Sequence, residues 1–299
     1  MPDRLIIDTI DEELAPGARN AIRVCLQLKA EERITIIADQ ATCDVAAALQ
    51  AEVEQVGSEH AVFVLENYDS RPLTSMPPLI LADLAQSQAS IFAAQSQPGE
   101  LTARREMTAV VDRHRIRHGH MVNISRQIML EGMRADFRAV DALSQRLVER
   151  AKSTQRIICK TPHGTDFEAE LSPRFKWLKT SGIITPEKWG NLPGGEIFTA
   201  PLNTNGRFVI DGVVGDYLCA KYGDLQDAPI TIEVRDNRIV DLACDHKQLL
   251  ADFRAYTSTD DNSNRVGVVT DGGAINVLGP FHINSIVEQA GRRMDEPDL

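Results

Sequence analysis

The sequence has few cysteines, no long apolar run and no excess of positive charge, and each absence excludes a class of protein. Five cysteines are spread over 299 residues without a Cys-x-x-Cys pair, so we expect reduced thiols and not a disulfide scaffold. No apolar run approaches the roughly 18 residues of a membrane-spanning helix, and the first residues do not resemble a signal peptide. The sequence therefore indicates a cytoplasmic protein without a membrane partner.

Acidic residues outnumber basic ones. Asp and Glu total 43 against 32 Lys and Arg, which gives a formal net charge of −11. A surface of this sign repels phosphate backbones, so we expect no nucleic-acid partner. Apolar residues make up 43% and charged residues 25% of the chain, as in ordinary globular proteins. The length of 299 residues predicts about two domains.

Short β-branched runs alternate with helical patterns in the first half of the chain. Strands are expected at 33–38, 61–65 and 89–93, and a helix at 44–56, between Thr42 as its N-cap and a glycine. Alternation at this spacing implies βαβ crossovers and a parallel sheet. We expect an N-terminal α/β sandwich domain over residues 1–130.

The pattern changes after an amphipathic helix expected at 136–152. Residues 156–161 and 166–171 alternate polar and apolar side chains around a turn, as antiparallel strands do. Further elements are expected at 195–200, 206–211, 230–234 and 238–242 (strands) and at 284–294 (a helix). The predicted fold class is α/β plus α+β: a linking helix within 131–152 and a β-rich C-terminal domain at 153–299 follow the first domain.

Most common catalytic motifs are absent. The sequence has no phosphate loop, no Gly-x-Gly-x-x-Gly after a strand, no nucleophile elbow and no His-Glu-x-x-His. His118 and His120 would face the same way on a strand, as two metal ligands can, but no third ligand is identifiable nearby. Ordinary histidines are the favoured interpretation of this pair.

The most distinctive stretch is Asn191-Leu192-Pro193-Gly194-Gly195-Glu196-Ile197-Phe198-Thr199-Ala200-Pro201. It places a carboxylate on a tight turn before a short apolar strand. This stretch resembles the Asn-Leu-Pro-x-Gly-Glu-Val-Phe-x-Ala-Pro signature of aminopeptidase T-type metallopeptidases. Segments resembling other parts of that family follow in the same order, at 102–106, 135–137, 161–166, 210–212 and 237–240.

The resemblance implies a homodimer with an N-terminal α/β domain and a C-terminal domain that carries metals. In the peptidases, glutamates, histidines and an aspartate bind two divalent metals, and Glu196 matches the first glutamate. The family also includes non-haem iron dioxygenases that open dihydroxypyridine rings.

Two departures from the family pattern suggest a divergent, truncated member that lacks most metal ligands. Val268 stands where the second glutamate is expected, and valine cannot bind a metal. His282 is followed two positions later by Asn284 instead of aspartate, so a His-x-Asp iron site cannot be assembled.

Three hypotheses remain. The favoured one is a non-catalytic peptide-binding protein without a cofactor, which binds a peptide or precursor peptide in natural-product biosynthesis. Glu196, His282 and Asp271 are its candidate ligand-contacting residues. The alternatives are an aminopeptidase with an atypical zinc, cobalt, manganese or iron site, and a metal-independent catalyst acting on a bound peptide.

Overall fold

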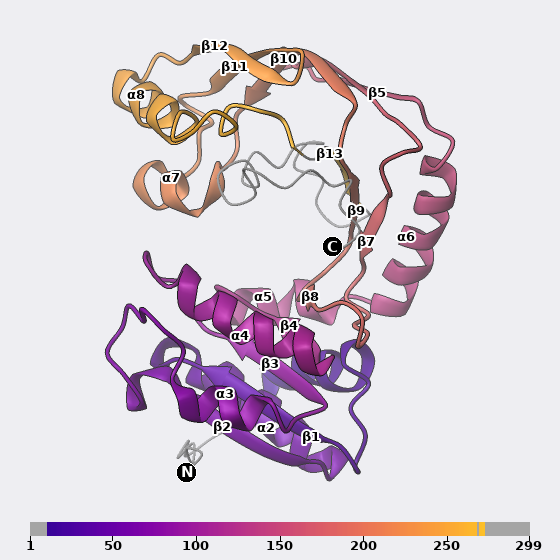
Figure 1. Cartoon of the computed structure of the whole chain (residues 1–299), viewed down its shortest axis with the longest axis vertical. Coiled ribbons are helices and arrows are strands. Elements are labelled where there is room, and N and C mark those ends of the chain that lie inside the picture. The colour runs from indigo at the N-terminus through magenta and orange to yellow at the C-terminus, as the bar shows by residue number, and fades with distance from the viewer. Residues whose placement is uncertain (1–10, 268, 273–299) are drawn as a thin grey trace. The chain divides into compact units, whose positions relative to one another are not determined.

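The computed structural model describes residues 11–267 and 269–272, which form two compact units (Figure 1). Unit 1 comprises the described residues up to Ala142 together with Thr180–Gly195, and unit 2 comprises Leu143–Lys179 and the described residues from Glu196 onward. The chain therefore passes between the units three times. The first passage lies within helix α6 (Phe137–Ala151).

Unit 1 is built on a parallel five-stranded sheet with the strand order β2-β1-β3-β4-β8. The strands are β1 (Arg33–Ala38), β2 (Glu59–Val64), β3 (Ala89–Ala93), β4 (Arg117–His120) and β8 (Gly190–Asn191). The predicted parallel-sheet domain is confirmed. Because β8 pairs with β4, the segment that contains β8 joins unit 1 although it lies beyond residue 153.

Helices cover both faces of this sheet. Helix α2 (Cys43–Val56) packs on one face and ends at Gly57, whose φ of 82° suits a residue without a Cβ. Helices α3 (Pro78–Leu84) and α4 (Leu101–His114) pack on the opposite face. Helices α1 (Ala15–Arg19) and α5 (Arg126–Leu130) join the α2 side.

Unit 2 contains an antiparallel sheet with the order β12-β11-β10-β6-β5. Its strands are β5 (Arg156–Lys160), β6 (Asp166–Glu170), β10 (Asn203–Ile210), β11 (Ile230–Arg235) and β12 (Arg238–Ala243). Helices α7 (Gly215–Tyr222) and α8 (Lys247–Tyr256) bury apolar side chains against one face (Figure 1). The predicted β-rich second domain is confirmed.

A smaller sheet of unit 2 holds the strand that contains Glu196. Its order is β13-β9-β7, with β13 (Val269–Gly272), β9 (Glu196–Thr199) and β7 (Leu178–Thr180). Ile197 on β9 is completely buried against α6, where it contacts the cluster of Val148 and Ala151.

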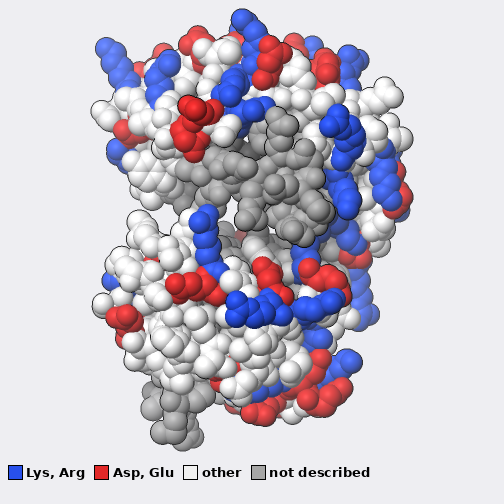
Figure 2. Space-filling model, in the orientation of Figure 1, with Lys and Arg blue, Asp and Glu red and all other residues white. Residues whose placement is uncertain are grey.

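The described surface is mixed in charge. Basic and acidic side chains are interspersed on the face shown in Figure 2. None of the described helices combines the length and the apolar character that crossing a membrane requires.

Candidate functional site

The carboxyl edge of the unit 1 sheet is a candidate ligand site. The chain runs from β1 to β2 on one side and then to β3 on the other, so the strand order reverses between β1 and β3. Open α/β sheets bind ligands in the crevice outside the strand ends at such a reversal. Asp39 directly follows β1, and Gln95 lies two residues beyond β3.

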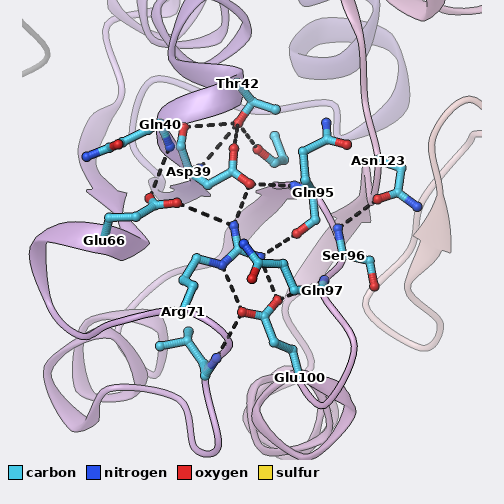
Figure 3. Close-up of polar contacts among 12 residues, drawn as sticks. Asp39, Gln40, Thr42, Glu66, Arg71, Gln95, Ser96, Gln97, Glu100 and Asn123 are labelled. Carbon is cyan, nitrogen blue, oxygen red and sulfur yellow. Dashed lines mark hydrogen bonds and ion pairs between the residues drawn. The ribbon is translucent and has the colours of Figure 1, made fainter. Parts of the chain in front are cut away.

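The side chain of Arg71 occupies this crevice (Figure 3). Its Nη1 donates to Asp39 Oδ2 at 2.5 Å, and its Nε and Nη2 donate to the two carboxylate oxygens of Glu100 at 2.8 and 2.5 Å. A further hydrogen bond runs to the Gln95 carbonyl. The Arg71, Asp39 and Glu100 side chains are only 4%, 1% and 3% exposed.

Every charged oxygen of this network has a donor. Asp39 also accepts from the Gln95 N–H and from the Thr42 hydroxyl, and Glu100 accepts from backbone N–H groups. Burial alone would raise the pKa of Glu100, but the hydrogen bonds from Arg71 and the Leu73 N–H lower it below its ordinary value. The network therefore anchors the loop that carries Arg71 to the sheet, and its charged groups are already paired with one another.

A second polar cluster lies beside β4. His118 Nδ1 is 2.8 Å from Ser90 Oγ on β3, and His118 Nε2 is 3.1 Å from His120 Nδ1. Ser90 and His118 are completely buried, and His120 is 8% exposed. The His120 ring stacks on Phe92 and lies 5.3 Å from the Trp189 ring.

The two histidines share a face, as their spacing predicts, but they are not metal ligands in this arrangement. His118 uses both ring nitrogens in hydrogen bonds, one of them to His120 itself. Within residues 11–267 and 269–272, no group of three or more His, Cys, Asp or Glu side chains is placed to hold a metal ion. Burial lowers the pKa of both imidazoles, His120 to about 4, so both are neutral at pH 7.

Glu196 is half-buried at the first position of β9. The residues before it pack closely within unit 1: a Cβ on Gly194 would lie 2.7 Å from the Gly182 nitrogen, and the Leu192 N–H donates to the His120 carbonyl. Since Ile197 points into the core and side chains alternate along a strand, Glu196 faces the other side of the small sheet.

The remaining candidate residues are placed only in part. In the register of β9 and β13, Gly272 lies opposite Glu196, and Asp271 lies opposite Ile197. Val268 and His282 lie outside the described residues.

The hairpin segment around His163 forms a shallow hollow of about 310 Å³ on the second unit's large sheet. His163 contacts the Asp211 carboxylate, and Arg207 pairs with Glu233 at 2.7 Å across β10 and β11. Exposed cross-strand pairs of this kind are typical of a solvated sheet face. The carboxylates on β6 have the same character, since Lys160 pairs with Asp166.

Comparisons with known proteins identify relatives that span both units. Residues 14–264 match the family model described as NicX: 2,5-dihydroxypyridine 5,6-dioxygenase. Among solved structures, 2,5-dihydroxypyridine dioxygenase from Pseudomonas putida superimposes with a TM-score of 0.65 and 12% identity, covering 94% of this chain and 82% of that one. Wild-type AmpT from Thermus thermophilus, an aminopeptidase T, gives a TM-score of 0.61 and 16% identity, covering 87% and 78%. A comparison with curated protein sequences gave no match.

These matches confirm part of the sequence interpretation and overturn another part. The similarity to aminopeptidase T is confirmed at the level of the fold. The prediction of a non-catalytic peptide-binding protein in natural-product biosynthesis is wrong, as are its peptidase and metal-independent alternatives, because the matching family model describes a dioxygenase. The expectation of no cofactor is wrong for the same reason, since the enzymes of that family depend on iron.

Proposed function

Because the chain belongs to the 2,5-dihydroxypyridine 5,6-dioxygenase family, we propose that it is an iron-dependent dioxygenase that opens a small hydroxylated aromatic ring. The observation that carries this proposal is the extent of the match. It covers residues 14–264, and thus the α/β unit and the β-rich unit together with the Glu196 motif. A match to one unit alone would support only a shared fold.

The described residues do not make an iron site by themselves. Residues 11–267 and 269–272 contain no group of three or more His, Cys, Asp or Glu side chains placed to hold a metal ion. A site of three or four protein ligands is the usual minimum for a catalytic metal. Glu196 is the described residue that we propose contacts the bound ligand or metal, together with His282. Asp271 lies opposite Ile197 and not opposite Glu196 in the register of β9 and β13, so we do not propose that it joins Glu196.

Glu196 suits this role through its backbone. The residues before it are held by close packing at Gly194, and the residue after it is anchored in the core through Ile197. A carboxylate next to a residue that is anchored in the core of unit 2 loses little conformational freedom when it binds. Opening a ring with both atoms of O₂ consumes one O₂ per ring and needs no separate reductant.

The test is oxygen uptake by the full chain. We would load the protein anaerobically with Fe(II), add 2,5-dihydroxypyridine and follow O₂ with an electrode while the ring absorbance is recorded. We expect one O₂ consumed per ring lost, and no uptake by the zinc-loaded protein. Protein that binds iron at near-stoichiometric amounts, yet consumes no O₂ with this compound or other dihydroxylated pyridines and benzenes, would contradict the proposal.

The role of Glu196 is tested separately. We expect Glu196→Gln to lower the bound iron or the rate of O₂ uptake at least tenfold. Glu170→Gln, which removes a carboxylate from the exposed face of β6, is the matched control and should leave both unchanged. Equal values for the two variants would exclude Glu196 from the site.

A further inference from the structure

The hollow on the large sheet of unit 2 lies outside the residues assigned to the proposed dioxygenase activity. Its volume of about 310 Å³ is at the small end of the roughly 300–1,000 Å³ of ligand pockets. The residues that line it come from β12, β11 and β10, which are neighbours in the sheet, and from the turn between β5 and β6. All of them belong to unit 2.

The floor of the hollow consists of short side chains. Ala243 lies opposite Thr231 in the register of β12 and β11, and Thr231 lies opposite Val209 in the register of β11 and β10. Gly164 completes this row, since a Cβ on it would lie 3.7 Å from a Val209 methyl carbon. Residues directly opposite each other share one face of a sheet. The hollow is therefore the space above a row without long side chains.

A row of charged side chains forms the wall beside this floor. Asp241 lies opposite Glu233, and Glu233 lies opposite Arg207. Each of the three is two residues from a floor residue on its own strand, so all three project on the same side of the sheet. Arg207 Nε donates to Glu233 Oε1 at 2.7 Å. The wall thus has a negative end at β12 and β11 and a positive end at β10.

The negative end has more charge than its partners neutralise. Like charges directly opposite each other on neighbouring strands are destabilising, and Asp241 and Glu233 are such a pair. Among the described residues Asp241 has one ion pair, with Arg254 at 3.8 Å, and Arg254 makes a shorter hydrogen bond of 2.7 Å to the Leu242 carbonyl. The two carboxylates therefore leave room for a further cation.

A primary ammonium group fits this end better than a metal ion does. No group of three metal-binding side chains occurs in residues 11–267 and 269–272, and metal sites usually need at least that many. An ammonium group has three N–H donors. Asp241, Glu233 and the Thr231 hydroxyl, which line the same hollow, supply three acceptors.

The positive end offers donors for an anion. Arg207 uses Nε for Glu233, and its two terminal nitrogens form no hydrogen bond within the described part of the chain. These nitrogens suit a carboxylate, which a guanidinium binds through parallel hydrogen bonds. His163, which contacts the Asp211 carboxylate, borders the hollow beside Gly164.

We propose that this hollow binds a short linear amino acid with its ammonium and carboxylate groups at opposite ends. The ammonium group lies at Asp241 and Glu233, the methylene groups cover the floor at Val209, and the carboxylate lies at Arg207. Asp241 and Arg207 are two strands apart, about 10 Å between their backbones, so a chain of about five carbons fits between their side chains. Binding needs neither iron nor O₂, and its test is independent of the proposed dioxygenase function.

The experiment is an NMR titration of the full, iron-free chain, labelled with ¹³C at its alanine and valine methyl groups. We expect 5-aminopentanoate to shift the Ala243 and Val209 signals with saturation. Pentylamine lacks the carboxylate, and pentanoate lacks the ammonium group. Because exposed charge pairs change an affinity by up to about fivefold, each of these two compounds should bind about fivefold more weakly.

Two variants test the two ends separately. Asp241→Asn removes the charge and keeps an oxygen for the Leu242 N–H, so it should weaken 5-aminopentanoate and pentylamine about fivefold and pentanoate not at all. Arg207→Gln should weaken 5-aminopentanoate and pentanoate by the same factor and pentylamine not at all. Glu170→Gln removes an exposed carboxylate from the same sheet outside the hollow and should bind all three compounds as the wild type does.

Three results would overturn the proposal. They are the absence of a saturable shift of the Ala243 and Val209 signals, binding of pentylamine or pentanoate as tight as that of 5-aminopentanoate, and an equal loss of affinity in Glu170→Gln and Asp241→Asn. Far-UV circular dichroism shows whether each variant is folded. If Asp241→Asn does not fold, Glu233→Gln tests the same end of the hollow.

Discussion

At the scale of single residues, two arginines of unit 1 differ in their hydrogen-bond partners. Arg71 is saturated by two buried carboxylates and a carbonyl, whereas the Nε of Arg104 has no partner among the described residues. Removing one partner from a buried ion pair leaves the other charge without compensation. Arg71 is therefore expected to matter for stability.

Replacement of Arg71 tests this expectation. We expect Arg71→Met to lower the free energy of unfolding by about 3–5 kcal/mol, because Asp39 and Glu100 would remain buried without a cation. The measurement is urea denaturation at pH 7. Arg105→Met should change the same free energy by less than about 0.5 kcal/mol, as exposed substitutions do. Equal effects of the two substitutions would show that the network contributes nothing.

The effect of Arg71→Met should also depend on pH. In the wild type the folded-state pKa of Glu100 lies below its ordinary value of 4.5, so its contribution to stability is present above that value and is lost as the pH falls through the folded pKa. Without Arg71, burial raises the same pKa, and acidification then relieves the buried charge. The difference in unfolding free energy between wild type and variant should therefore shrink from pH 7 to pH 4. A constant difference would contradict this.

The buried histidines affect the free energy of unfolding in a higher pH range than Glu100 does. The folded-state pKa of His120 is about 4, against an ordinary value of 6.5. Between pH 6.5 and pH 4, His120 is therefore protonated in the unfolded chain and neutral in the folded chain. The free energy of unfolding thus falls as the pH drops from 6.5 towards 4. For His120 alone the loss amounts to about 3 kcal/mol. Urea denaturation between pH 7.5 and 4.5 should show this fall, and the fall should be smaller in His120→Phe.

At the scale of secondary-structure elements, local pattern predicted the strands whose residues are apolar in sequence. The β-branched runs of β1 and β3 were placed with their observed bounds at 33–38 and 89–93. The pattern did not indicate β8, because two residues hold a strand only through pairing with β4, far away in the sequence. Helix α4 was not predicted, although its buried residues Ala103, Met107 and Val111 recur every four positions, as on one face of a helix.

The polar clusters could not be predicted from the local sequence pattern for a related reason. Asp39, Arg71 and Glu100 come from three separate connections that only the folded sheet brings together. The spacing of His118 and His120 did predict a common face, but not that the two rings bond to each other. Glu196 was found through its resemblance to a family signature, and the structure adds the reason for Gly194, where a Cβ would lie 2.7 Å from the Gly182 nitrogen.

The two glycines that precede Glu196, Gly194 and Gly195, are expected to differ. A Cβ at Gly194 would lie 2.7 Å from the Gly182 nitrogen and 3.0 Å from the Asn191 carbonyl, whereas at Gly195 it would lie 3.4 Å from a Val140 methyl group. We expect Gly194→Ala to destabilise the protein by about 1–3 kcal/mol, the usual cost of overpacking. Gly195→Ala should cost less than about 1 kcal/mol. The measurement is thermal or urea unfolding, and the reverse order would contradict the geometry.

At the scale of the whole molecule, the two units have separate hydrophobic cores. The chain has two tryptophans, and each unit contains one: Trp189 lies in unit 1 and Trp177 in unit 2. Unfolding of such a chain need not be a single transition. Fluorescence can therefore follow each unit separately once one tryptophan is replaced.

This arrangement gives a prediction for where a substitution acts. In a Trp177→Phe background, Arg71→Met should shift the urea midpoint reported by Trp189 to lower concentration. In a Trp189→Phe background, the midpoint reported by Trp177 should move much less. Equal shifts for both reporters would show that the units unfold as one cooperative block, and that the division of the chain has no energetic meaning.

The late position of β8 has a consequence for how the protein is made. About 70 residues separate His120 on β4 from Gly190 on β8, and a ribosome adds roughly 5–20 residues per second. For about 4–14 seconds the nascent sheet therefore ends at β4, with an open strand edge and with Trp189 not yet synthesised. In that interval the unpaired backbone groups of β4 are open to pairing with a strand of another chain, so the newly made protein is most prone to aggregate before Gly190 and Asn191 emerge.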